Sequence, residues 1–199
     1  IGDGPLTNVN NSLSFDGVDD RVIITSNNLP SGNSARSLSA WFYPESGNGN
    51  IFAYGDGQVH SRRFSVLMSN GNMYFVGEGN DHLGHIVSLN QWHFVTITYG
   101  NNELKMYVDG ALIDSTVLGT DLNTDSSYPL VIASNTTTRN DEYFGGKVAQ
   151  VTIWDRVLNA TEIQSQVSCP PSTNATGLLG YWELGNNAND ATVYGNNGA

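Results

Sequence analysis

Apolar and polar side chains alternate along most of this chain with the period of two that a half-buried β-strand produces. Residues 92–99 (WHFVTITY) show the pattern clearly, because Val95 and Ile97 alternate with Thr96 and Thr98. Alternating or short continuous apolar runs of this kind predict strands at 20–25, 37–43, 51–54, 63–68, 72–76, 92–99, 103–108, 128–133, 147–154 and 178–184. Many short strands with almost no helical periodicity between them indicate an all-β fold.

The residues between these strands are typical of tight turns. Asn70-Gly71 and Asp109-Gly110 each join two predicted strands, and Gly100-Asn101-Asn102 joins another pair. A type I′ turn needs positive φ at both central residues, a conformation that Asn, Asp and Gly tolerate best. The turns on either side of 103–108 therefore predict three consecutive antiparallel strands that end with ALIDSTV at 111–117.

One segment, 159–167, predicts a helix. Asn159 or Thr161 would cap its start, and Ile163 and Val167 share a face at i and i+4. We therefore expect residues 1–199 to form a single all-β domain, a two-sheet antiparallel β-sandwich with one short helix. No internal repeat or linker divides the chain, and its opening at Ile1 rather than Met indicates a piece of a larger protein.

The net charge is −11, from 8 Lys and Arg against 19 Asp and Glu. Such a surface repels phosphate backbones and anionic lipids, so we expect neither nucleic-acid binding nor membrane insertion. The carboxylates suit either divalent cations or a solvated acidic surface, and both interpretations stay open. The single cysteine, Cys169, excludes an internal disulfide, and no run of about 18 apolar residues is present.

Five segments in order, SLSFDGVDDRVII, SLSAWFYP, QWHFVTITYGNNELKMYVDGALI, FGGKVAQVTIWDRVLNATEI and GLLGYWEL, resemble the laminin G-like jelly roll. This superfamily also contains pentraxins, legume lectins and many bacterial carbohydrate-binding modules. The resemblance implies a concanavalin A-like jelly roll, an extracellular or cell-surface location, and a binding function. The ligand it implies is a carbohydrate or cell-surface glycan, or else a protein. It does not specify the oligomeric state.

Calcium is the cofactor we expect, at the turn 15–20 (FDGVDD). Asp16, Asp19 and Asp20 lie around Gly17, which lets the backbone turn and aim carbonyl oxygens inward, and Asp190 is a further possible ligand from the C-terminal segment. Relatives often carry a structural calcium near this turn, which the resemblance extends to these residues. The alternative is that Asp16-Gly17 simply forms a hairpin turn.

A second calcium-binding feature of the resemblance is absent here. Pentraxins hold two calcium ions with an acidic loop that corresponds to 133–146 (ASNTTTRNDEYFGG) in this chain. The early part of this loop offers Asn135 and three threonines where carboxylates are expected. The resemblance therefore does not bring the two ions to this sequence.

Three polar loops, 55–63, 77–85 and 134–143, are rich in charged, histidine and aromatic residues that turns do not require. Loops on a rigid scaffold commonly carry function, so we predict that they form a ligand-binding rim; the alternative is solvated loops without a ligand. The predicted ligand-binding residues are Tyr54, Asp56, His60, Arg62, Glu78, Asp81, His82, Arg139, Asp141 and Tyr143. The four tryptophans lie in strand patterns instead, which favours packing.

The sequence favours a non-catalytic protein. No strand carries the paired carboxylates of a sandwich-fold glycosidase, and Asp141-Glu142 point to opposite faces because they are adjacent. The chain has no G-x-S-x-G motif, and Cys169 has no neighbouring histidine. We therefore predict a binding module, with a structural or protein-interaction spacer as the second hypothesis and a polysaccharide-active enzyme as the third.

Overall fold

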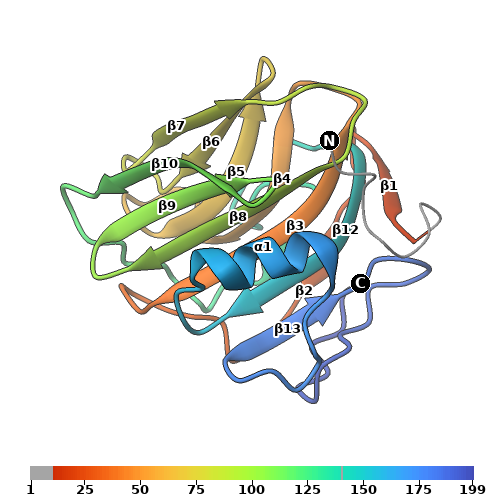
Figure 1. Ribbon diagram of the computed structural model, residues 1–199. Helices are drawn as coiled ribbons and strands as arrows, with labels where there is room; N and C mark the ends of the chain where they lie inside the picture. The colour runs from red at the N-terminus through yellow and green to blue at the C-terminus, as the bar shows by residue number, and fades with distance from the viewer. Residues whose placement is uncertain (1–10, 140) are drawn as a thin grey trace.

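Two antiparallel β-sheets pack face to face in the computed structural model, which describes residues 11–139 and 141–199 (Figure 1). The first ten residues of the predicted domain, and Asn140 of the predicted rim, lie outside the described residues. The strands agree with the predicted all-β sandwich, and the one described helix with the predicted helical segment.

We call the seven-stranded sheet sheet A. Its strands run in the order β1-β12-β3-β8-β9-β10. Strands β1 and β13 pair with the same edge of β12, β1 with its first half and β13 with its second half. Their bounds are β1 Leu13–Asp16, β3 Arg36–Pro44, β8 His93–Gly100, β9 Glu103–Val108, β10 Ala111–Val117, β12 Gly145–Trp154 and β13 Leu178–Trp182.

The six-stranded sheet is sheet B, with the order β2-β11-β4-β5-β6-β7. Its strands are β2 Val22–Ile24, β4 Gly49–Gly55, β5 Arg63–Ser69, β6 Asn72–Val76, β7 His82–Ile86 and β11 Leu130–Ile132. Strand β7 overlaps the segment 77–85 that we predicted as a loop, so the loop prediction is wrong for residues 82–85. The polar residues His82 and His85 led us to predict a loop. An edge strand has only one neighbouring strand and tolerates such polar residues.

The hairpin turns have the predicted geometry. Asn70 and Gly71 have φ of 51° and 77°, and Asp109 and Gly110 have φ of 52° and 81°. These turns join β5 to β6 and β9 to β10 with antiparallel pairing. Local turn chemistry therefore determines that β5 lies beside β6 and that β9 lies beside β10.

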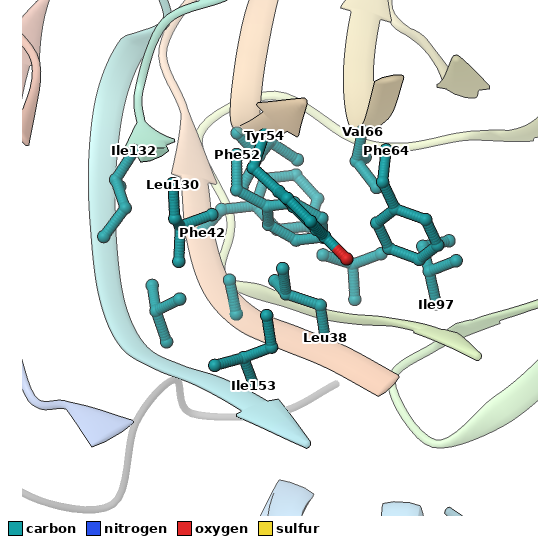
Figure 2. Packing of buried hydrophobic residues seen from close by; sticks show 14 of the residues in the cluster. Leu38, Phe42, Phe52, Tyr54, Phe64, Val66, Ile97, Leu130, Ile132 and Ile153 are labelled. Atoms are coloured by element: carbon teal, nitrogen blue, oxygen red, sulfur yellow. The ribbon is translucent and has the colours of Figure 1, made fainter. Parts of the chain in front are cut away.

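The core lies between the inner faces of the two sheets, where alternate residues of each strand meet. Figure 2 shows Leu38, Phe42 and Ile97 of sheet A facing Phe52 and Phe64 of sheet B. All of these side chains are buried. Three of the four tryptophans are also buried and the fourth, Trp92, is partly buried against Trp41 and Phe94, so their predicted packing role is confirmed.

Helix α1, Ala160–Ser168, lies across the outer face of sheet A (Figure 1). Its Ile163 packs with Trp154 and Tyr107 on that face. The Asn159 side chain accepts from the Glu162 backbone N–H, and the Glu162 carboxylate accepts from the Asn159 N–H, which is a complete capping box. None of the helices in the described part of the chain is long and apolar enough to cross a membrane.

Candidate functional site

A buried arginine organises the place where the polar loops meet. Arg63 begins β5 and its side chain is only 1% exposed. Its Nη1 donates to Glu78 Oε1 at 2.9 Å, and its Nη2 donates to Asn50 Oδ1 at 2.7 Å and to Glu142 Oε2 at 3.1 Å. These bonds join strand β4, strand β5 and both loops that follow β6 and β11. A buried charge is stable only when it is paired in this way.

Asn135 extends the cluster into the loop that follows β11. This buried side chain donates through Nδ2 to Asp141 Oδ1 at 2.7 Å and to Glu142 Oε2 at 2.9 Å. Asn50 Nδ2 also donates to Glu142 Oε2, at 2.8 Å. We call Asn50, Arg63, Glu78, Asn135 and Glu142 the Arg63 network. The guanidinium of Arg63 supplies the positive charge beside this loop, where the sequence predicts no pair of calcium ions.

The exposed side of the network presents Arg139 and Asp141. Arg139 Nε lies 3.6 Å from Asp141 Oδ2, and its Nη1 lies 3.7 Å from Glu78 Oε1 and donates to the Gly57 carbonyl at 3.4 Å. The side chains of Arg139 and Asp141 are 38% and 49% exposed. They therefore combine fixed positions with access to solvent, which is what a polar ligand requires.

The loop after β4 borders the same place. Gln58 Nε2 donates to the Thr138 carbonyl at 2.7 Å, and Gly57 N donates to Thr138 Oγ1 at 3.0 Å. Asp56 is buried and accepts from Gln58 N at 3.0 Å, so its carboxylate forms the turn. The structure thus brings loops 55–62, 77–81 and 134–142 together, and we call this region the rim.

Arg62 marks the edge of the rim. Its Nη2 lies 3.1 Å from Asp125 Oδ2, and its Nη1 lies 4.0 Å from Asp56 Oδ2. Hydrogen bonds from Ser127 to Asp125, followed by the charge of Arg62, hold the pKa of the Asp125 carboxyl below its usual value. Asp125 therefore stays ionised as the partner of Arg62.

Tyr54 is not a surface residue, although we predicted it among the ligand-binding residues. Its ring is fully buried between the sheets beside Phe64, as Figure 2 shows. Its hydroxyl accepts from Arg36 Nη1 at 2.9 Å and donates to the Pro30 carbonyl at 3.1 Å. Burial raises the pKa of Tyr54, and the neighbouring Arg36 opposes that rise. The alternation of β4 places Tyr54 on the core side, so no ligand at the rim reaches it.

Four other predicted residues lie around the rim. His60 is exposed, hydrogen-bonds Ser61 Oγ through Nδ1 at 2.7 Å, and its ring lies close to Gly79. Asp81 accepts from Gly77 N at 2.9 Å, so it shapes the turn before β7. His82 is part of β7 itself, and Tyr143 is half-buried just before β12.

The predicted calcium ligands of the turn 16–20 meet in space. Oxygen atoms of Asp16, Asp19 and Asp20, all exposed, lie within 4.8 Å of one another. Gly17 has φ of +80°, and a Cβ there would come 3.2 Å from Gly145 Cα, so glycine is needed for this turn to lie against β12. Oxygen ligands at this spacing suit a hard cation such as calcium.

Asp190 does not belong to this acidic turn. Its Oδ1 accepts from the backbone N–H of Tyr181 and Thr192, at 3.1 and 2.9 Å. Its Oδ2 accepts from Thr192 Oγ1 and from Asn196 N, each at 2.9 Å. Those four bonds fix the C-terminal loop, which explains an aspartate there without a metal.

Sequence reasoning missed Asn50, which directly precedes the strand predicted at 51–54. The structure shows it fully buried at the start of β4, in the Arg63 network. Polar residues in β4 and β5, such as Asn50 and Arg63, were the available signal that these strands carry a polar cluster. Their contact with Glu142, which lies 92 residues after Asn50, is not visible in a local pattern.

The fold and the loop arrangement define the class of the protein: a jelly-roll domain with polar loops gathered over one sheet. The profile of the concanavalin A-like lectin/glucanases superfamily, Laminin_G_3, matches residues 16–164. The chain therefore belongs to this laminin G-like family.

One related curated protein is the rat sushi, von Willebrand factor type A, EGF and pentraxin domain-containing protein 1. The two are 28% identical over 132 residues, which is 60% of this chain and 4% of the rat protein. The chain thus spans a small fraction of that relative.

Two solved structures share the fold at low identity. A candidate carbohydrate-binding protein from Bacteroides ovatus superposes with a TM-score of 0.74 at 16% identity, over 94% of this chain and 57% of the other. Domain 4 of the extracellular arabinanase AbnA from Geobacillus stearothermophilus, solved with arabinotriose, gives 0.55 at 19%, over 70% and 68%. At these identities the likeness shows the fold alone.

Proposed function

We propose that this chain is a non-catalytic carbohydrate-binding or adhesive module of a secreted or cell-surface protein, and that glycans bind at the rim. The observation that carries the proposal is the Arg139–Asp141 pair, half exposed and held by the buried Arg63 network. A guanidinium presents parallel N–H donors and a carboxylate presents acceptors, so together they match neighbouring sugar hydroxyls.

Rigidity supports this proposal. A ligand that meets pre-positioned side chains pays little conformational entropy on binding. The Arg63 network joins strands β4 and β5 to the loops that follow β6 and β11 through buried bonds, so the exposed groups above it start in fixed positions. The arabinotriose held by domain 4 of the arabinanase supports the fold as a frame for oligosaccharides.

A glycan array, probed with and without calcium, tests the proposal. The double variant Arg139→Ala/Asp141→Asn should lose at least about tenfold in affinity for every glycan that the wild type binds, because truncating buried or central polar contacts costs about 1.4 kcal/mol or more. Lys105→Ala, a cation on β9 of the other sheet, is the matched control. No bound glycan under any condition would leave the protein-interaction spacer as the better function.

We also propose a structural calcium at Asp16, Asp19 and Asp20. Support comes from their convergent oxygen atoms and from the close packing of Gly17 on Gly145. A cation bound only to the native state raises the melting temperature by mass action. Calcium should therefore raise the melting temperature of the EDTA-treated wild type and leave that of Asp16→Asn/Asp20→Asn nearly unchanged. Equal melting curves for the wild type with calcium and with EDTA would refute the calcium proposal and leave the hairpin-turn interpretation.

A further inference from the structure

The C-terminal loop forms a second polar hollow, away from the rim. It lies between loop 25–28 and the segment 190–196 and has a volume of about 260 Å³. Its lining consists of Asn27, Asn28, Tyr194 and Asn196. The lining combines one aromatic ring with three amides and carries no charged group, in a protein of net charge −11.

The loop that carries Tyr194 is held rigidly. The Asp190 carboxylate accepts four hydrogen bonds from within the loop and from β13. Trp182 Nε1, from the buried end of β13, donates to the Asn196 carbonyl at 2.8 Å. Farther along, Ala199 exchanges two backbone hydrogen bonds with Ile23 of β2. The loop is therefore pinned to both sheets and its side chains are pre-positioned.

The amides of the hollow have unused hydrogen-bonding capacity. Asn196 Nδ2 donates to the Leu179 carbonyl at 3.1 Å and to Asn28 Oδ1 at 3.3 Å, which leaves Asn196 Oδ1 as an acceptor. Asn28 Nδ2 is buried and has no acceptor among the described residues. A buried donor without a partner costs free energy, which rotation of the Asn28 side chain toward an acceptor in the hollow would recover. Asn27 is exposed at the mouth.

Tyr194 offers an apolar surface at the same place. It is 53% exposed, although the loop around it is fixed. Exposed rings of this kind are typical of binding surfaces, because they supply contact area at a low cost in conformational entropy. The C–H face of a pyranose is flat and apolar, and its edge carries hydroxyls that both donate and accept. The Tyr194 ring matches the apolar face of the sugar, and the asparagine amides match its hydroxyls.

We propose that the Tyr194 hollow is a second sugar-binding subsite, specific for a neutral terminal pyranose. The sugar stacks on the Tyr194 ring and its hydroxyls bond to Asn27, Asn28 and Asn196. A neutral ligand follows from the uncharged lining, because an acidic sugar would find no cation there and would meet a negative protein. The ligand class rests on the proposed function, but the site does not. A glycan that reached both the rim and this hollow would gain from multivalency.

Residue-resolved NMR titration with the methyl glycosides of glucose, galactose and mannose tests the proposal on the whole chain. One of these sugars should shift the signals of Tyr194 and the side-chain amides of Asn27 and Asn196. Tyr194→Ala should weaken this binding at least about tenfold, and Tyr194→Phe should keep it, because stacking needs the ring and not the hydroxyl. Val193→Ala, next to Tyr194 and 86% exposed, is the matched control.

The outcomes separate the two sites. Shifts at the hollow that vanish in Tyr194→Ala and persist in Arg139→Ala/Asp141→Asn support the subsite. Shifts confined to the rim overturn the subsite and leave the proposed function intact. Shifts at neither place, with any of the three sugars, overturn the subsite, and the glycan array then decides the rim independently.

Discussion

Arg63 and Arg62 are neighbours in sequence but occupy opposite environments. Strand alternation turns Arg63 toward the loops that cover sheet B, where it is buried with three oxygen partners. Arg62 precedes the strand, is 37% exposed, and pairs with Asp125 at the surface. One position in the chain therefore separates an arginine that organises the loops from one that lies at their edge.

Substitution should reveal this difference. Arg63→Met should destabilise the protein by about 3 kcal/mol, since it removes the cation beside Glu142 and leaves Glu78 with only the longer contact to Arg139, while the partial exposure of both carboxylates limits the loss. Arg62→Met should cost less than about 1 kcal/mol, as exposed ion pairs do. Urea denaturation of both variants measures the two values, and equal losses would contradict the assigned role of Arg63.

His93 gives the fold a dependence on pH. Its Nδ1 lies 3.1 Å from Asp109 Oδ2 and its Nε2 lies 3.1 Å from the Ser88 carbonyl. Asp109 Oδ2 and the Ser88 carbonyl are both acceptors, so both imidazole nitrogens donate a hydrogen bond only when the ring is protonated. The hydrogen bond with Asp109 raises the pKa of His93 above 6.5, although partial burial opposes the rise. For Asp109, burial alone would raise the pKa, but the bonds from His93 and Phe94 N outweigh it and the pKa is lowered.

These directions set the sign of the pH effect. Because the pKa of His93 is higher in the folded state, its contribution is complete below about pH 6.5 and is lost as the pH rises through the folded value. The melting temperature should therefore fall as the pH rises above about 6.5 in the wild type, by more than in His93→Gln. Thermal melts across this range measure the difference, and parallel curves for the two proteins would show that His93 contributes no such term.

Helix α1 depends on its cap and on the sheet beneath it. Nine residues, Ala160–Ser168, are too few for a stable isolated helix, so packing of Ile163 on sheet A must contribute most of its stability. The capping box at Asn159 adds a local term, and Arg156 bonds to Glu162 of the box. The hydrogen bond from Arg156, followed by that from the Asn159 N–H and by the charge of Arg156, lowers the pKa of the Glu162 carboxyl against the effect of burial, which keeps the box ionised.

Removing the cap should therefore cost a measurable but limited amount. Asn159→Ala should lower the free energy of unfolding by about 1 kcal/mol, because the Glu162 backbone N–H loses its acceptor. Thr161→Ala, an exposed neighbour in the first turn, should change it by less than about 0.5 kcal/mol. Chemical denaturation compares them, and a loss in Thr161→Ala as large as in Asn159→Ala would argue against the capping assignment.

Across the whole molecule, the C-terminal segment closes one side of the sandwich. Asp190 attaches it to β13 of sheet A, and Ala199 pairs with Ile23 of sheet B (Figure 1). The two sheets are thus joined by backbone and carboxylate hydrogen bonds as well as by the core. This connection explains why an aspartate predicted as a metal ligand is needed for architecture.

Asp190→Ala should destabilise the protein by about 2–3 kcal/mol, because it removes a charged acceptor that is 9% exposed and satisfies four donors. Hydrogen exchange should speed up within 190–199 and at Tyr181, and stay unchanged at the rim. EDTA should leave the wild-type exchange of this segment unaltered. A calcium-dependent change in exchange at 190–199 would restore Asp190 as a metal ligand.

Short-range patterns defined most of the strands, the hairpin turns, the helix and the family. Period-two alternation identifies core positions such as Ile97, and Asn70-Gly71 accommodates the positive φ of its turn, because these properties depend on residues close in sequence. The same patterns missed β7, whose edge position tolerates polar residues. They also misplaced Tyr54, since a residue near a loop was expected to face the ligand.

Contacts between distant segments were decided by the way the sheets and loops pack. Glu142 meets Arg63 across 79 residues, and Asn196 meets Asn28 across 168. Local preferences say nothing about such pairs, because each depends on the register of several strands and on how far a loop folds back. The acidic turn 16–20 was readable from the sequence since its three carboxylates are close neighbours in the chain, whereas the rim and the Tyr194 hollow exist only once loops from several parts of the chain are brought together.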